Sequence, residues 1–436
     1  MLIAQTTVNE DKAKQHQYPT SLVSLVIDFI LSTISFRAVE RIFLIIKNSA
    51  IPIFQFFNFQ PSWKSAELWF LRIGLYKLTR VKEKAKDWIV ILDFKVQAGR
   101  QKCLIILGVR LSTLVNKFKE RGSFDIHHED FEPLAVMPVD SANGQHVGQV
   151  LEDISKMTGE FLQLIADHGS DVNKGVRLYC SNHSSTVNTY DTMHKVAILL
   201  KNELEKDDVW KEIIRLITET KQTTKQSSEA CLSPPKQREK ARFMNADILI
   251  DWLQEMLDFM ITSPEVAYLD RNKIKEKLGW VLEFEDIIEE YILMIEIIRL
   301  ARHQIRTEGL HRGTQVIFFR KLRNQYKSLR GRPLNLAKEI IKFFKKEGMQ
   351  IPAGKIFIGS SEGIESVIGR QKTIAERTKA TNSITKNVLG IAAMVGASGP
   401  ALVKEALEAI SVKMLEEWED QWIGKSDLSK RREIFC

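Results

Sequence analysis

Cysteine is scarce in this chain of 436 residues, and its few copies lie far apart. No two of them form a CxxC pair, and none stands near histidines at the spacing of a zinc site. A zinc module is therefore excluded, and the cysteines fit a reducing cytoplasm as ordinary residues. The four are Cys103, Cys180, Cys231 and Cys436.

The chain also lacks an uncharged apolar run of about 18 residues, the length that a membrane-spanning helix needs. Its most apolar stretch, residues 22–46, is interrupted by charged side chains. These are Asp28, Arg37, Glu40 and Arg41. The first residues carry Glu10, Asp11 and Lys12 before any apolar run, unlike a signal peptide. We expect neither a membrane span nor a secretory leader.

Acidic residues are nearly absent from residues 299–332, which hold ten Lys or Arg and one acid, Glu308. This stretch contributes +9 to a formal net charge of +8, so the rest of the chain sums to −1. Such a concentrated excess favours an acidic partner such as nucleic acid. On a helix expected from residue 313 to 330, four cations would form one stripe with no acid among them. They are Arg320, Arg323, Lys327 and Arg330.

Apolar spacing predicts three helices in the N-terminal region, residues 1–82. Ser35 is expected to cap the second helix, and Ser62 the third, which runs from Trp63 to about Leu78. Basic residues on the third helix suggest a helix-turn-helix-like DNA-binding region, with a plain helical bundle as the alternative. These residues are Lys64, Arg72 and Lys77.

From residue 88 the pattern becomes that of an α/β fold. Residues 88–96 and 103–111 are rich in β-branched residues and predict a hairpin, and residues 131–139 can form a third strand. A helix over residues 145–157 and a buried strand over 161–166 follow, with a further strand before Asp191. This order predicts a mixed sheet with helices on its faces.

Three acids in this pattern are candidate metal ligands. Asp93 lies inside an apolar strand, Asp167 directly follows another strand, and Glu365 begins a helix behind Gly359-Ser360-Ser361. Burying a carboxylate is costly unless it is paired or binds metal. Carboxylates suit Mg²⁺ (or Mn²⁺), and two such ions would serve phosphoryl transfer. The alternative is three unrelated structural or surface acids.

Together these segments resemble the DDE transposases of bacterial insertion sequences, which share a ribonuclease-H-like core. The resemblance is carried by WIVILD ending at Asp93, by LIADHGSD around Asp167, by YDTMHK over residues 190–195, and by SEGIES around Glu365. Lys372 follows Glu365 by seven residues, as in part of the signature of related transposases. Ser361 stands where that signature has Arg, so the subfamily stays open.

The resemblance implies a transposase that binds transposon ends and catalyses metal-dependent DNA strand cleavage and transfer. Asp93, Asp167 and Glu365 would be catalytic and hold two Mg²⁺ or Mn²⁺ ions. The implied partners are double-stranded DNA, as transposon ends and target, and further copies of the chain. No membrane and no small-molecule substrate are implied, and the location would be the cytoplasm, in association with the nucleoid.

Alternatives remain inside these motifs. Asp171 is an alternative to Asp167, although Asp167 directly follows the strand. Glu362 is an alternative to Glu365, which shares a helix face with Lys372. Asp191 and His194 are expected to be supporting residues near the site, or else a plain strand-end Asp and helix-start His. Besides the basic stripe, the expected DNA contacts are Lys372, Arg370, Lys64 and Arg72. The run His127-His128-Glu129-Asp130 is interpreted as a polar loop, because neighbouring residues cannot all point one way.

The expected organisation is a helical region over 1–82, a ribonuclease-H-like core over 83–210 and 346–395, a helical insertion over 211–345, and a helical tail over 396–436. The second part of the core would begin with a short strand over residues 355–358. Trp252 and Trp280 in the insertion either pack in its core or stack on unpaired bases. Two other functions remain possible: a metal-dependent nuclease without strand transfer, and a non-catalytic DNA-binding remnant of a transposase.

Overall fold

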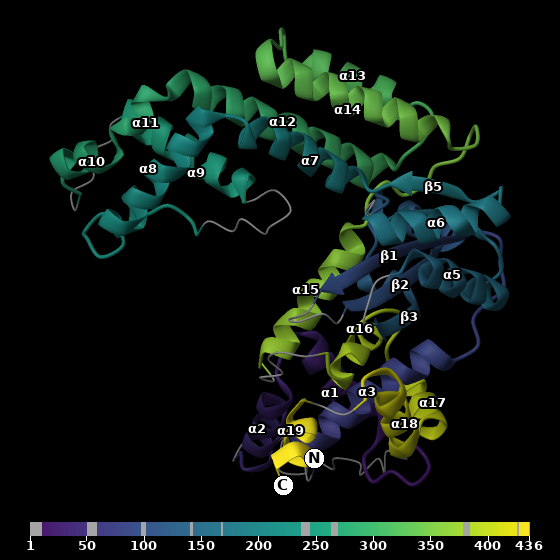
Figure 1. Ribbon diagram of the computed structural model, residues 1–436. Coiled ribbons are helices and arrows are strands. Elements are labelled where there is room, and N and C mark those ends of the chain that lie inside the picture. The colour runs from purple at the N-terminus through teal and green to yellow at the C-terminus, as the bar shows by residue number, and fades with distance from the viewer. Residues whose placement is uncertain are drawn as a thin grey trace, which may run out of the picture. The chain divides into compact units, whose positions relative to one another are not determined.

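The computed structural model describes residues 11–49, 59–96, 102–139, 143–166, 169–236, 245–262, 269–377, 384–424 and 427–435. The chain divides into two compact units, labelled by element in Figure 1. Unit 1 comprises Met1–Thr189 and Ser361–Cys436, and unit 2 comprises Tyr190–Ser360. Unit 1 is therefore built from two separate stretches of sequence, with unit 2 inserted between them.

The three expected N-terminal helices are confirmed as α1 (Thr20–Leu31), α2 (Phe36–Lys47) and α3 (Trp63–Thr79). Both expected caps are confirmed as well. The Ser35 hydroxyl accepts a hydrogen bond from the backbone N–H of Ala38 at 3.3 Å, and the Ser62 hydroxyl accepts one from Ser65 at 3.1 Å. Each cap satisfies a backbone donor that the first helical turn leaves without a partner.

Helix α3 is enclosed by C-terminal segments of unit 1. It packs against α16, α17 and α18, and a Cβ added at Gly74 would collide with the carbonyl oxygen of Leu389. The segments are η4 (Lys386–Leu389), α16 (Gly390–Ala393), α17 (Pro400–Ala409) and α18 (Val412–Trp422), followed by α19 (Asp427–Phe435). This arrangement matches the helical-bundle alternative, because a recognition helix has to present one face to DNA.

The predicted mixed sheet is confirmed, with five strands in the order β3-β2-β1-β4-β5. Strand β1 pairs antiparallel with β2 and parallel with β4, while β2 pairs antiparallel with β3. The strands are β1 (Trp88–Val96), β2 (Lys102–Arg110), β3 (Glu132–Val139), β4 (Phe161–Ala166) and β5 (Val187–Tyr190).

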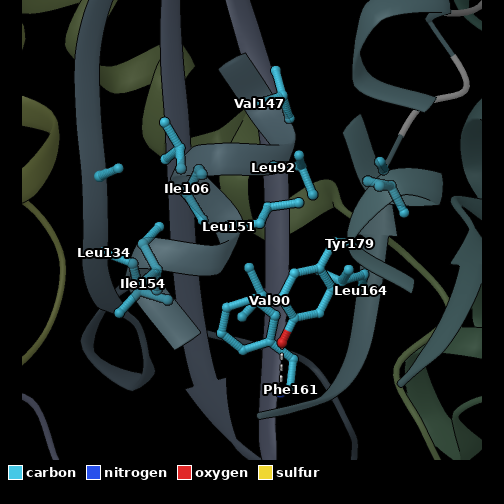
Figure 2. Packing of buried hydrophobic residues seen from close by; sticks show 14 of the residues in the cluster. Val90, Leu92, Ile106, Leu134, Val147, Leu151, Ile154, Phe161, Leu164 and Tyr179 are labelled. Atoms are coloured by element: carbon cyan, nitrogen blue, oxygen red, sulfur yellow. Dashed lines mark hydrogen bonds between the residues drawn. The ribbon is translucent and has the colours of Figure 1, made fainter. Parts of the chain in front are cut away.

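One face of the sheet is covered by α5 (Gly144–Thr158), which the sequence predicted, and α6 (Ser170–Asn182), which it did not. Alternate residues of β1, such as Val90 and Leu92, pack there against Val147 and Leu151 of α5 (Figure 2). The neighbouring β1 side chains must point to the opposite face, since direction alternates along a strand. Helix α4 (Leu111–Arg121) and η2 (His128–Asp130) connect β2 to β3, and α15 (Glu362–Arg377) contacts β1.

The regular secondary structure described in unit 2 is helical, apart from the end of β5 and one bridge. Its helices are α7 (Thr192–Glu205), α8 (Asp208–Thr224), α9 (Ala246–Thr262), α10 (Arg271–Leu278), α11 (Trp280–Glu283), α12 (Glu285–Glu308), α13 (Thr314–Gln325) and α14 (Gly331–Met349), with η3 (Ala230–Leu232). The strand predicted over residues 355–358 is wrong. Phe357 forms an isolated bridge with Leu310, since this partner lies in the short segment between the end of α12 and Thr314, where α13 begins.

A charged network joins three helices of unit 2. The Arg332 guanidinium at the start of α14 donates to both Asp207, the N-cap of α8, and Glu290 of α12. The Tyr291 hydroxyl donates to the same Asp207 carboxylate at 2.5 Å, and its ring lies 5.1 Å from the guanidinium carbon of Arg332. These contacts hold the beginning of α14 against α12. No helix in the described ranges combines the length and the hydrophobicity needed to cross a bilayer.

Candidate active site and nucleic-acid interface

Asp93 lies on the central strand β1, opposite Ile105 of β2, and its side chain is half-buried. Because Val90 and Leu92 face α5, strand alternation directs Asp93 toward the face that α5 and α6 do not cover. Helix α15 contacts β1, and Figure 1 draws the C-terminal end of that strand beside it. Asp93 is therefore a carboxylate within the sheet on the strand that α15 contacts.

Strand β4 leads up to the second candidate acid in the sequence. It pairs parallel with β1, and Leu92 is the partner of Ala166. In the sequence, Asp93 follows Leu92 and Asp167 follows Ala166. Asp167 itself lies outside the described residues.

Helix α15 carries the third candidate acid on its exposed side. Ile364 and Val367 are fully buried, whereas Glu365 and Lys372 are exposed. The seven-residue spacing places these two side chains on one helix face, as expected, and Arg370 is exposed as well. Glu362, the alternative acid, is half-buried in the first turn.

Asp191 and His194 lie at the start of α7 in unit 2. Asp191 is 1% exposed, and its carboxylate accepts a hydrogen bond from the N–H of Met193 at 2.8 Å, so it caps the helix. His194 is half-buried, with its ring centroid 5.8 Å from that of Tyr190. The cap is the plainer of the two roles that the sequence allowed for Asp191.

A second buried carboxylate lies close to the start of α7 and was not predicted from the sequence. Glu347 of α14 is 3% exposed and accepts the N–H of Tyr190 at 2.9 Å. Burial raises the pKa of Glu347. No local signal marked this residue, because its partner lies 157 positions earlier in the chain.

In the described ranges, which omit Asp167, no three His, Cys, Asp or Glu side chains gather into a metal-binding group. The run from His127 to Asp130 is accordingly no metal cluster. The Arg121 guanidinium donates to Asp130 at 2.6 Å, and the Asp130 carboxylate also accepts the N–H of His127 at 2.8 Å. This matches the expectation of a polar loop.

The basic stretch divides into paired and unpaired cations. Lys321 forms an ion pair with Glu308, and Arg299 one with Asp251, while Arg332 belongs to the network with Glu290. Four exposed cations make no ion pair with any residue that the structure describes. These are Arg320, Arg323, Lys327 and Arg330.

The continuous helix expected over residues 313–330 is wrong. Helix α13 ends at Gln325, and Tyr326 turns into an extended conformation while its hydroxyl donates to Glu296 of α12 at 3.0 Å. Arg320 and Arg323 therefore lie on the helix, whereas Lys327 and Arg330 follow in the loop before α14. The single four-membered helical stripe does not exist.

The exposed side of α13 also carries apolar residues that sequence reasoning missed. Val316 is 44% exposed and Phe319 is 47% exposed, next to Arg320 and Arg323. The Arg323 guanidinium carbon lies 5.9 Å from the Phe319 ring centroid. The i, i+3, i+4, i+7 spacing was visible in the sequence, but Phe318 and Phe319 could not be told apart, and Phe318 is the buried one.

The two candidate DNA contacts on α3 differ sharply. Arg72 is 7% exposed, and its guanidinium donates to the carbonyl oxygens of Leu407 and Ile410 at the end of α17. It stabilises the helical bundle and offers no surface to phosphate. Lys64 keeps an exposed ammonium, 2.9 Å from Glu67.

Trp252 is buried in unit 2, and Trp280 packs beside it half-buried. Trp252 is 6% exposed and donates to the carbonyl oxygen of Leu232, and Trp280 donates to the Thr220 hydroxyl at 2.9 Å. Their ring centroids lie 6.4 Å apart. The packing interpretation therefore holds for both residues.

No protein-family model matches the chain, and no curated protein matches it in sequence. Among solved structures, it is similar to the Drosophila P element transposase strand transfer complex, with 11% identity and a TM-score of 0.42. The alignment covers 92% of this chain and 94% of that one. So low a TM-score carries no argument, and the functional assignment rests on the residues themselves.

Proposed function

We propose that this chain is a DNA transposase of the DDE type, which cleaves and rejoins DNA strands with Asp93, Asp167 and Glu365. The observation that carries the proposal is the parallel register of the two central strands, in which Leu92 pairs with Ala166. The residues that follow in sequence are both aspartates, which supports two carboxylates from neighbouring strands at one point of the sheet.

The sheet order supports a ribonuclease-H-like core for this enzyme. Three consecutive antiparallel strands are followed by a helix and by a strand parallel to the first, in the spatial order β3-β2-β1-β4-β5. The unit that separates this core from α15 is helical, which fits the helical insertion implied by the resemblance.

Carboxylate oxygens are hard ligands that fit Mg²⁺ or Mn²⁺, and Asp93, Asp167 and Glu365 would hold two such ions. When bound, the ions would supply Lewis-acid activation of the phosphate and of the attacking oxygen. Lys372 shares the exposed helix face of Glu365, so its ammonium can hold a DNA phosphate on that side. Arg370, exposed on the same helix, would add a second phosphate contact.

DNA binding by unit 2 is supported by the cations on α13 and in the loop that follows, which pair with no acid in the described part of the chain. A group of like charges repels itself unless an external anion or solvent compensates for it. Phe319 adds a ring face among these cations, and nucleic-acid surfaces commonly combine aromatic side chains with cationic ones. Assembly of several copies on paired DNA ends belongs to the same proposal.

The test is to incubate the purified chain with DNA carrying the sequences that flank its own gene, with and without Mg²⁺. Asp93→Asn and Glu365→Gln should abolish both nicked and joined products while DNA binding persists, because each change removes only one metal-ligating charge. Asp171→Asn and Glu362→Gln are the matched controls, and both should stay active.

Each other outcome has a defined meaning. Nicks without joined products would identify a nuclease that does not transfer strands. Binding without any product in the unmodified chain would identify a DNA-binding remnant. Loss of activity in Glu362→Gln but not in Glu365→Gln would move the third ligand to residue 362.

A further inference from the structure

The turn η2 is tied to the rest of unit 1 from two sides. The Arg121 guanidinium of α4 holds Asp130 at 2.6 and 3.3 Å, and Asp130 in turn holds the backbone of His127. The N–H of Gly396 donates to the carbonyl oxygen of His128 at 2.9 Å. His128 therefore sits on a backbone that hydrogen bonds fix in place.

From this turn His128 reaches across to α15. Its Nε2 lies 3.0 Å from the Ser366 hydroxyl oxygen, and Ser366 is the residue next to Glu365. The His128 side chain is half-buried. This hydrogen bond joins the turn to the second turn of the helix that carries the third candidate acid.

A second contact reinforces the first. A Cβ added at Gly363 would lie 2.7 Å from the Phe131 ring, so the ring already touches the α15 backbone there. Phe131 directly follows η2 and is 1% exposed. Gly363 and Ser366 are three residues apart, so both contacts fall on one side of α15 and bracket Glu365 in sequence.

Two contacts spaced along one side of a helix fix both its rotation and its position along the axis. A helix that can neither turn nor slide presents Glu365 at a single position over the sheet. Buried side chains, among them Ile364 and Val367, pack α15 as well, and the hydrogen bond adds a polar contact beside Glu365.

The charges around His128 are compatible with a neutral imidazole. Burial, and then the nearby Arg370 guanidinium of α15, lower the pKa of His128, while Glu129 acts in the opposite direction and His127 in the same one. A neutral ring keeps one nitrogen as donor and the other as acceptor, so it can bond a hydroxyl in either sense.

We infer that His128 is a positioning residue for Glu365, acting through its hydrogen bond to Ser366 and helped by the Phe131 contact at Gly363. The inference rests on the proposed role of Glu365 as a metal ligand. His128 touches neither metal nor DNA in this scheme; it sets where the carboxylate stands.

The experiment compares His128→Ala, His128→Gln and Ser366→Ala with His127→Ala, the matched control. His127 is the neighbouring histidine, it is exposed, and its ring nitrogen lies 3.3 Å from the exposed Glu129 carboxylate. His128→Ala and Ser366→Ala should each reduce kcat for cleavage by roughly 10- to 100-fold, the usual cost of losing a group that orients a metal ligand. The Mg²⁺ concentration for half-maximal activity should rise, and KM for DNA should stay constant.

The double variant His128→Ala/Ser366→Ala should have a kcat no lower than that of either single variant, because both changes remove the same hydrogen bond. His128→Gln should recover most of the activity, since its amide can replace the ring nitrogen. In the metal-free chain, amide hydrogen exchange over residues 363–368 should accelerate in both single variants and stay unchanged over α5. His127→Ala should leave every one of these measurements as in the unmodified chain.

The inference and the proposed function fail in different ways. Loss of cleavage in Glu365→Gln, with unchanged metal dependence and unchanged α15 exchange in both His128→Ala and Ser366→Ala, overturns the inference alone. Full cleavage by Glu365→Gln overturns the role of Glu365 as third ligand, and full cleavage by Glu362→Gln as well overturns the proposed function. Ser366→Ala removes one oxygen atom and keeps the helix intact, so the test does not depend on how well His128→Ala folds.

Discussion

At the scale of single residues, the basic side chains of α3 stabilise the fold from inside. Arg72 donates two hydrogen bonds to the backbone carbonyl oxygens of Leu407 and Ile410 at the end of α17. Removing a buried donor leaves such acceptors unsatisfied and costs the desolvation of each.

We expect Arg72→Met to lower the free energy of unfolding by roughly 3 kcal/mol, because two carbonyl groups lose a charged donor. Urea unfolding followed by circular dichroism measures this. Lys64→Met on the same helix removes an exposed ion pair, worth about 0.2–1 kcal/mol, and an exposed contact with the Trp63 ring. Equal effects of the two changes would contradict the buried role of Arg72.

A second prediction at this scale concerns Lys77 and the pH dependence of stability. It is 1% exposed and donates to the carbonyl oxygens of Ala393 and Val395. Burial lowers its pKa to about 7, against about 10.5 in the unfolded chain. Between these values the unfolded chain binds the extra proton, so the stability of the folded chain should rise with pH.

Lys77→Met should therefore flatten the pH dependence of unfolding over that window. The measurement is urea unfolding of both proteins at several pH values between about 7 and 10.5. The neighbouring Lys82, whose pKa burial also lowers, is present in both proteins and cancels in the comparison. Parallel curves for the two proteins would show that Lys77 is charged in the folded state.

At the scale of elements, α13 and the loop after it present the cations that no described acid neutralises. We expect the change of Arg320, Arg323 and Lys327 to Ala to reduce the slope of log K against log salt by roughly one unit per lost phosphate contact. Titration of DNA binding against salt, with the fold verified, measures this slope.

The matched control changes three other exposed cations of unit 2, Lys201, Lys211 and Arg215, to Ala. Each of them already pairs with an acid on its own helix or next to it. This control should leave the slope unchanged. An unchanged slope in the first triple variant would place the DNA path elsewhere.

Local signals predicted the elements that depend on neighbours in sequence. The serine caps of α2 and α3, the strand that contains Asp93 and the predominantly helical character of residues 211–345 could all be predicted directly. What could not be read depends on partners far along the chain. Arg72 is buried by residues 407–410. Helix α13 ends at Gln325, where the Tyr326 hydroxyl donates to Glu296, and Arg332 holds the start of the next helix through Glu290.

The same reasoning applies to the candidate site. Asp93 and Asp167 stood out because one interrupts and the other follows an apolar strand, and Glu365 because it begins a helix behind Gly359-Ser360-Ser361. The register that pairs Leu92 with Ala166 is a tertiary fact, and so is the bond from His128 to Ser366. No periodicity in the sequence indicates that a polar loop at residue 128 reaches a helix 238 residues later.

At the scale of the whole molecule, each of the two units has its own core, so unfolding should not be a single two-state step. Calorimetry should resolve two transitions. Arg332→Met breaks the network with Asp207 and Glu290 and should lower the midpoint of one transition, while Arg72→Met should lower that of the other. A single shared transition that both changes shift would mean that the units unfold together.

The split of unit 1 across the sequence also has a consequence for synthesis. Residues 386–410 cover α3, but the ribosome synthesises them long after α3. The apolar surface of α3 therefore stays uncovered while the entire inserted unit is synthesised. At about 5–20 residues per second that delay lasts many seconds. A nascent chain in this state is the form most exposed to aggregation and to chaperone capture, and a stalled or truncated message would leave it so permanently.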